Sequence, residues 1–204
     1  MQKEESRWAT DDLELFERLS WELLTRGAQS PKEDAHWPTL ATVDAAGRAR
    51  ARTVVLRRVE RAEGALEFYT DARAQKVRHL QDNPWASVHV YDGSRRVQVR
   101  AQVRAHLHVE DEVARERWEG LGARGRLDYC RQPAPATPSE QWETGLEPSW
   151  KQDPPDAQQI QWAFANFCVM RCVIESMDAL YLARSGHRRA LFDLTNQTRS
   201  WVIP

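Results

Sequence analysis

The sequence predicts a mainly β fold with flanking helices, a β+α class built around an antiparallel barrel or meander. Between residues 39 and 108, five stretches rich in β-branched residues alternate in the manner of strands. The connections between them are short, which favours antiparallel neighbours. The chain of 204 residues has 41% hydrophobic and 29% charged residues, as expected of one globular domain, here 1–204.

The first element is predicted to be an amphipathic helix. Asp11 with Glu14 provides a helix start, apolar residues follow at helical spacing, and Gly27 provides the stop. We expect residues 1–10 to be frayed.

The central part is predicted to alternate between strands and tight turns. Asp71 is expected to cap a helix whose Val77 and Leu80 face inward, and Asp92-Gly93 is the clearest hairpin signal. The expected elements are strands at Thr39–Asp44, Arg48–Val59, Leu66–Thr70, Ala86–Tyr91 and Arg95–His108, and the helix Ala72–Asp82.

The C-terminal half contains a segment of a different composition. Residues 122–156 hold six of the ten prolines, which indicates a long surface excursion, a lid or an arm that wraps a dimer. Around it we expect helices at Glu110–Leu121 and Ser139–Thr144, and strands at Phe167–Ser176, Met177–Ala183, Arg188–Leu194 and Ser200–Ile203.

Composition argues against several classes of protein. A formal net charge of -1 does not favour nucleic acid as a partner, and we expect neither a membrane helix nor a secretory signal. Cys130, Cys168 and Cys172 form no Cys-x-x-Cys pair, which favours a reducing cytoplasm and argues against a structural metal. Nine tryptophans need a large core or an interface, so a homodimer is one interpretation.

The stretch from residue 51 to 80 could hold a phosphate. Arg52 and Arg57 bracket a strand, Thr70 ends another, and Lys76 lies in the first turns of a helix. The alternative is a solvated strand face before an ordinary capped helix. Arg52 and Arg57 have opposite parity, so either a bulge lies between them or they serve different groups.

Other polar groups point to no site by themselves. Arg96, Gln98 and Arg100 are expected on one strand face, which could meet a polar ring or water. His106 and His108 share a face but have no third ligand nearby, so we expect no metal, and no residue stands out as catalytic.

The order of these pieces resembles the pyridoxamine 5'-phosphate oxidase-like, oxidase-related family of FMN-binding split barrels. The resemblance covers roughly residues 38–107 and 167–204. It is carried by these motifs: Arg52-Thr53-Val54-Val55-Leu56-Arg57, Phe68-Tyr69-Thr70-Asp71, Ala74-Gln75-Lys76, Arg95-Arg96-Val97, Met177-Asp178-Ala179-Leu180-Tyr181-Leu182 and His187-Arg188-Arg189-Ala190-Leu191-Phe192.

The resemblance implies FMN bound between two subunits of a homodimer. Arg52, Lys76 and Thr70 correspond to the phosphate ligands, and the backbone of residues 53–56 to the edge of the flavin ring. The full set of implied cofactor residues is Arg52, Thr53, Val54, Val55, Leu56, Arg57, Tyr69, Thr70, Gln75, Lys76, Gln98 and Tyr181. His187 and Arg189 are implied as substrate residues.

Departures from the family pattern weaken the prediction of pyridoxamine phosphate as substrate. Gln75 replaces an arginine of the phosphate site, Ala74 a serine, and Arg96 a glutamine near the ring. The leading hypothesis is a cytoplasmic flavoprotein that transfers hydride between a small substrate and FMN, with oxygen or a nicotinamide cofactor as the other partner. The alternatives are a non-enzymatic module that holds FMN or haem, and a nucleic-acid-binding barrel.

Overall fold

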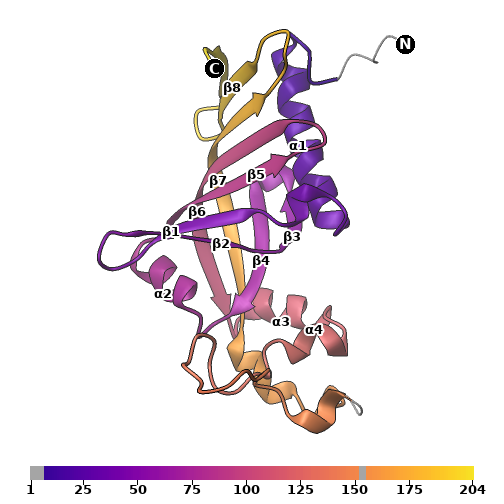
Figure 1. Ribbon diagram of the computed structural model, residues 1–204, viewed down its shortest axis with the longest axis vertical. Coiled ribbons are helices and arrows are strands. Elements are labelled where there is room, and N and C mark those ends of the chain that lie inside the picture. The colour runs from indigo at the N-terminus through magenta and orange to yellow at the C-terminus, as the bar shows by residue number, and fades with distance from the viewer. Residues whose placement is uncertain (1–6, 152–154) are drawn as a thin grey trace.

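The computed structural model describes residues 7–151 and 155–204, and within them nine strands form one sheet (Figure 1). The sheet order is β2-β1-β5-β6-β7-β4-β3, β8 and β9 extend it beyond β7, and all neighbours are antiparallel. The predicted mainly β class is therefore confirmed. The strands are β1 (Thr39–Val43), β2 (Ala49–Thr53), β3 (Leu56–Glu60), β4 (Ala65–Asp71), β5 (Trp85–Asp92), β6 (Val97–Val109), β7 (Phe167–Tyr181), β8 (Arg188–Asp193) and β9 (Thr198–Val202).

Four α-helices flank the described sheet, and Figure 1 shows α1 at one end of it and α2, α3 and α4 towards the other. Among the described residues, no helix is both long enough and apolar enough to cross a bilayer. The helices are α1 (Leu13–Gln29), α2 (Gln75–Asp82), α3 (Glu112–Glu119) and α4 (Ala123–Leu127), and short 3-10 turns lie at Asp34–His36, Arg61–Glu63, Pro148–Lys151 and Gln161–Asn166.

The first helix differs from its prediction at both ends. Asp12, not Asp11, caps it, because the Asp12 carboxylate accepts the N–H groups of Glu14 and Leu15. Gly27 does not end the helix, which continues to Gln29. A Cβ at Gly27 would lie 2.6 Å from the backbone of Ala35, so this glycine permits a close approach instead.

The predicted fraying of residues 1–10 is wrong for residues 7–10. Trp8 is buried, and its ring packs edge-on against Phe16 with centroids 5.3 Å apart. Residues 1–6 lie outside the described residues.

Two strand boundaries were predicted wrongly. The expected strand 48–59 is two strands, β2 and β3, which pair with different neighbours and are separated by Val54-Val55. A register irregularity between Leu56 and Arg58 places a bulge at Arg57. The two strands expected at 167–176 and 177–183 are instead one, β7, whose inner and outer faces are both covered near its start.

Turn residues account for two further corrections. Arg96 adopts a positive φ of 57° in the β5–β6 turn, so it does not share the strand face of Gln98 and Arg100. α2 begins at Gln75, three residues later than predicted, and Asp71 does not cap it. The Asp71 carboxylate instead accepts the backbone N–H of Arg73 at 2.8 Å and its Nη2 at 2.7 Å.

Two clusters of buried apolar side chains hold the elements together. The larger lies between α1 and the inner face of the sheet, and it includes Cys168 and Cys172, as well as the predicted Val77 and Leu80. The smaller joins α3 and the segment after it to the outer face of β4 and β7, around Trp118. The helix expected at 139–144 does not form.

Candidate functional site

Arg52, Lys76 and Thr70 come together where β2, the first turn of α2 and the end of β4 meet; we call these three residues the cation cluster. Lys76 Nζ donates to Thr70 Oγ1 at 2.8 Å. Burial lowers the pKa of Lys76, and the positive charge of Arg52 lowers it further, which places the two cations near each other. Burial likewise lowers the pKa of Arg52.

Neither cation of the cluster forms an ion pair within the described part of the chain. Among residues 7–151 and 155–204, Arg52 donates only to neutral oxygens, and Lys76 only to the Thr70 hydroxyl. Other partly buried arginines of this chain are paired: Arg117 with Glu67 at 2.8 Å, and Arg189 with Asp178 at 2.8 Å. Desolvated cations without a counter-charge are costly, so this arrangement favours an anion between them.

The start of α2 adds to the positive potential of the cluster. Ala74 occupies the N-cap position and provides no side-chain acceptor, and the first turn carries no acidic residue. The first N–H groups of a helix lack intrahelical partners and carry the positive end of the helix dipole. A phosphate beside Lys76 would meet both features.

Sequence reasoning did not identify two polar residues behind the cluster. The Thr42 hydroxyl on β1 accepts from Arg52 Nη1 at 2.9 Å and lies 3.0 Å from His79 Nδ1 on α2. His79 follows Lys76 by three residues, so their shared helix face was a usable signal. The contact with Thr42 joins residues 37 positions apart, and periodicity gave no sign of it.

Arg57 and Tyr69 lie apart from the cation cluster. Along β4, Phe68 and Thr70 face the larger core, whereas Tyr69 faces the smaller one. The Arg57 guanidinium stacks over the Tyr69 ring, 5.9 Å from its centroid. The bulge therefore directs Arg57 to the opposite side of the sheet from Lys76, and the two arginines serve different surroundings.

Residues 53–56 link the two regions. Thr53 ends β2 on the exposed surface, Val54 and Val55 are half-buried, and Leu56 is fully buried. The Val54 N–H donates to Pro38 O at 2.9 Å and is therefore occupied within the chain. The Leu56 side chain belongs to the core, so only its backbone could meet a ligand.

Among the described residues, no hydrogen bond or ion pair joins the side chains of the remaining predicted residues to the cation cluster. Gln75 is exposed at the start of α2. Gln98 lies on the outward face of β6, where its Oε1 is 3.2 Å from His89 Nε2, and Tyr181 ends β7. His187 Nδ1 accepts from Ala183 N–H at 3.2 Å, and Arg189 makes two hydrogen bonds to Asp178.

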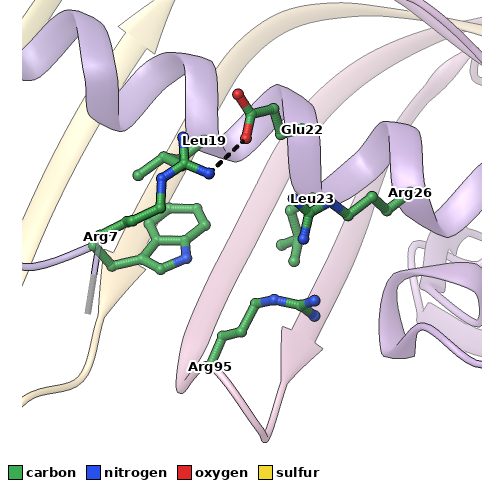
Figure 2. Close-up of a pocket in the computed structure, with 7 residues that line it drawn as sticks. Arg7, Leu19, Glu22, Leu23, Arg26 and Arg95 are labelled. Carbon is green, nitrogen blue, oxygen red and sulfur yellow. Dashed lines mark hydrogen bonds and ion pairs between the residues drawn. The ribbon is translucent and has the colours of Figure 1, made fainter. Parts of the chain in front are cut away.

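A separate cavity of about 190 Å³ lies beside α1 (Figure 2). Leu19 and Leu23 supply apolar surface, while Arg7 reaches Glu22 at 3.4 Å. Arg95 also lines it but is paired with Glu33 at 2.7 Å and with Asp92. Arg26 lines the cavity too, but the other two of its three arginines are paired, so this cavity is a weaker anion site than the cation cluster.

Comparisons with known proteins concern the same part of the chain. Residues 19–109 match the family described as pyridoxamine 5'-phosphate oxidase, FMN-binding domain. A pyridoxine/pyridoxamine 5'-phosphate oxidase of Deinococcus deserti is 37% identical over 82 residues, which are 40% of this chain and 36% of that protein. The match thus spans about a third of that relative's length.

Two solved structures extend the similarity to the whole fold. An FMN-binding protein of Nostoc punctiforme, described as related to pyridoxamine 5'-phosphate oxidase, aligns with a TM-score of 0.71 and 25% identity over 93% of this chain and 97% of that one. PhzG from Burkholderia lata, solved with tetrahydrophenazine-1-carboxylic acid, aligns with a TM-score of 0.65 over 100% and 99%. At 15% identity the second shows the fold alone. The resemblance found in the sequence and the split-barrel fold are confirmed, and the family model that matches is that of an FMN-binding domain.

Proposed function

We propose that the chain is a flavin-dependent oxidoreductase, on the premise that its residues 19–109 match the FMN-binding domain of the pyridoxamine 5'-phosphate oxidase family. Bound FMN supplies hydride transfer with a small organic substrate, and oxygen or a nicotinamide cofactor serves as the other partner. The protein binds the flavin, orients it and excludes water.

The observation that carries this proposal is that the two cations of the cation cluster are partly buried and form no ion pair within the described residues. A phosphate monoester would supply the negative charge that pairs with Arg52 and Lys76. The Thr70 hydroxyl and the first turn of α2 add hydrogen-bond donors for the same group. These residues fit the FMN phosphate. We assign Arg52 and Lys76 as its charged ligands and Thr70 as a supporting ligand.

The segment after Arg52 is placed to bind the flavin ring. Val54 and Val55 lie between β2 and β3, so their backbone groups are outside the regular ladder, although the Val54 N–H is bonded to Pro38 O. Arg57 supplies a cation without a carboxylate partner in the described chain, next to the Tyr69 ring. We assign Arg57 and Tyr69 to the ring or substrate side, and Gln75 to the rim of the phosphate site.

We further propose that the functional unit is a cytoplasmic homodimer. Gln98 and Tyr181 do not reach the cation cluster within one chain, so a second subunit would supply them. The outward face of β5 exposes Trp85 by 45% and Tyr91 by 48%, which suits a subunit interface. The three free, buried cysteines fit a reducing compartment.

The proposal names one cofactor, but for the substrate it names only a class of molecule. Arg189 is held by Asp178, which leaves it less charge to offer a substrate phosphate, and His187 is exposed. A small organic substrate is therefore the proposal, and pyridoxamine 5'-phosphate is one member of the test panel.

The test begins with the absorption spectrum of the purified protein and identification of the cofactor released by acid. We expect a yellow protein that releases FMN. Reduction of the flavin by NADPH, or peroxide formation with pyridoxamine 5'-phosphate or pyridoxine 5'-phosphate, would then establish turnover, with free FMN as the control. A protein that binds FMN but remains inactive across this panel would contradict the catalytic proposal and favour a binding module.

A further inference from the structure

We propose that Thr42 and His79 are positioning residues that fix the Arg52 guanidinium for the FMN phosphate. This inference rests on the proposed phosphate role of Arg52. The two residues touch Arg52 directly or through one hydroxyl, and they couple β1, β2 and α2 behind the cation cluster.

The first step of the argument concerns how Arg52 is held. Its Nη1 donates to Leu40 O at 3.1 Å and to Thr42 Oγ1 at 2.9 Å. Both bonds use the same nitrogen, and within the described residues Nε and Nη2 donate to no protein acceptor. The guanidinium is thus held at one end, and its other N–H groups remain for a ligand that can accept two bonds, such as a phosphate.

The second step concerns the direction of the Thr42 hydrogen bonds. Arginine can only donate, so the Thr42 oxygen accepts from Arg52 and its single hydrogen is left for another group. Thr42 is 1% exposed, and His79 Nδ1, 3.0 Å away, accepts that hydrogen in the ring tautomer that carries its proton on Nε2.

The third step concerns what the coupling achieves. His79 and Lys76 lie on one face of α2, so the helix that carries one phosphate cation also supports the anchor of the other. The phosphate ligands come from β2 and α2, which are separate in sequence. The Thr42–His79 contact fixes their relative position before the ligand arrives, which reduces the entropy lost on binding.

The experiment compares FMN with riboflavin, which lacks the phosphate, in fluorescence-quenching titrations of the full chain. Thr42→Val keeps the shape of the side chain and removes both hydrogen bonds, whereas Thr42→Ser keeps the hydroxyl. We expect Thr42→Val to weaken FMN binding about tenfold and to leave riboflavin binding unchanged, as loss of about one charge-assisted hydrogen bond predicts. Thr42→Ser should bind FMN within about twofold of the native chain.

An Arg52→Ala background shows whether Thr42 acts through Arg52. There, adding Thr42→Val should cause no further loss of FMN affinity, whereas an additive loss would overturn the positioning role. If Thr42→Val does not fold, the FMN affinities of His79→Leu and His79→Asn are compared instead. Asn retains an acceptor near the Nδ1 position, so only the Leu variant should lose FMN affinity, and equal affinities would overturn the inference.

Failure of this inference is distinguishable from failure of the proposed function. If the native chain does not bind FMN, or Arg52→Ala binds it as tightly as the native chain, the proposed phosphate site itself is wrong and the positioning role falls with it. If Arg52→Ala weakens binding but Thr42→Val matches the native chain, the positioning role alone is overturned.

Discussion

At the scale of single residues, the cation cluster lowers the stability of the FMN-free fold while it provides positive charge for an anion. Burial and the charge of Arg52 both lower the pKa of Lys76, and Asp71, which would offset this, is held by Arg73. The folded FMN-free protein therefore binds this proton more weakly than the unfolded chain. The cost in stability is therefore full at pH values below the folded pKa, and stability rises as the pH passes from the folded pKa towards the ordinary lysine value.

Lys76→Met should therefore stabilise the FMN-free protein at neutral pH. Methionine fills similar space without a desolvated charge, and the lost bond to Thr70 only partly offsets that gain. The measurement is the urea midpoint of FMN-free protein. Arg50→Met is the control, because Arg50 is exposed and paired with Asp44 at 2.9 Å, so no gain is expected there. A lower midpoint for Lys76→Met would contradict a cost of burying this cation.

Some residues of the candidate site could be predicted from the sequence and others could not. Arg52, Thr70 and Lys76 were identifiable because each lies at the end of a strand or the start of a helix, in a recognisable family order. Thr42 was not, and His79 had only the helix face it shares with Lys76 as a signal, because the link between the two depends on α2 packing against β1. The position of Arg57 depended on a bulge that alternation alone left open.

At the scale of elements, close packing overrode local sequence signals. Gly27 reads as a helix stop, yet it lies within α1 where the helix approaches the turn at Ala35. Similarly, residues 48–59 read as one strand, although β2 and β3 belong to opposite ends of the sheet order. Strand propensity found the residues, and only the tertiary pairing placed the break.

Gly27→Ala tests the packing explanation. Alanine favours helices by about 1 kcal/mol over glycine, but the added Cβ would lie 2.6 Å from the backbone of Ala35. Overpacking of this kind typically costs 1–3 kcal/mol, so we expect a net loss of about 1 kcal/mol in the free energy of unfolding. Gly125→Ala in α4 is the matched control, because its nearest neighbour is the Leu121 side chain at 3.3 Å. Stabilisation by Gly27→Ala would refute the close approach.

At the scale of the whole molecule, the chain has two faces of different character. α1 and the larger core close the inner face of the sheet, whereas α3 and the segment after it cover the outer face of β4 and β7. The outward face of β5 and β6 is left with exposed aromatic residues and Gln98. Strand alternation and short connections predicted the antiparallel class, but the paths of residues 122–151 and 155–166 followed from contacts that no periodicity encodes.

Trp85→Glu tests the proposed homodimer. A charge in the centre of an apolar interface is costly, so this variant should sediment as a monomer and lose FMN affinity together with dimerisation. Trp142→Glu is the control, because Trp142 is 84% exposed and belongs to the proline-rich segment, not to β5. A native chain that is monomeric at all concentrations and still binds FMN fully would exclude a shared site.

The central claim is that Arg52 and Lys76 hold the FMN phosphate, and calorimetric titration of FMN tests it most directly. The comparison uses the native chain, Arg52→Ala, Lys76→Met and the control Arg50→Ala, whose arginine lies two residues from Arg52 on β2. Each cluster variant should bind FMN about 10- to 150-fold more weakly, the equivalent of about 1.5–3 kcal/mol for a charge-assisted hydrogen bond, while Arg50→Ala matches the native chain. Native affinity in both cluster variants would contradict the assignment.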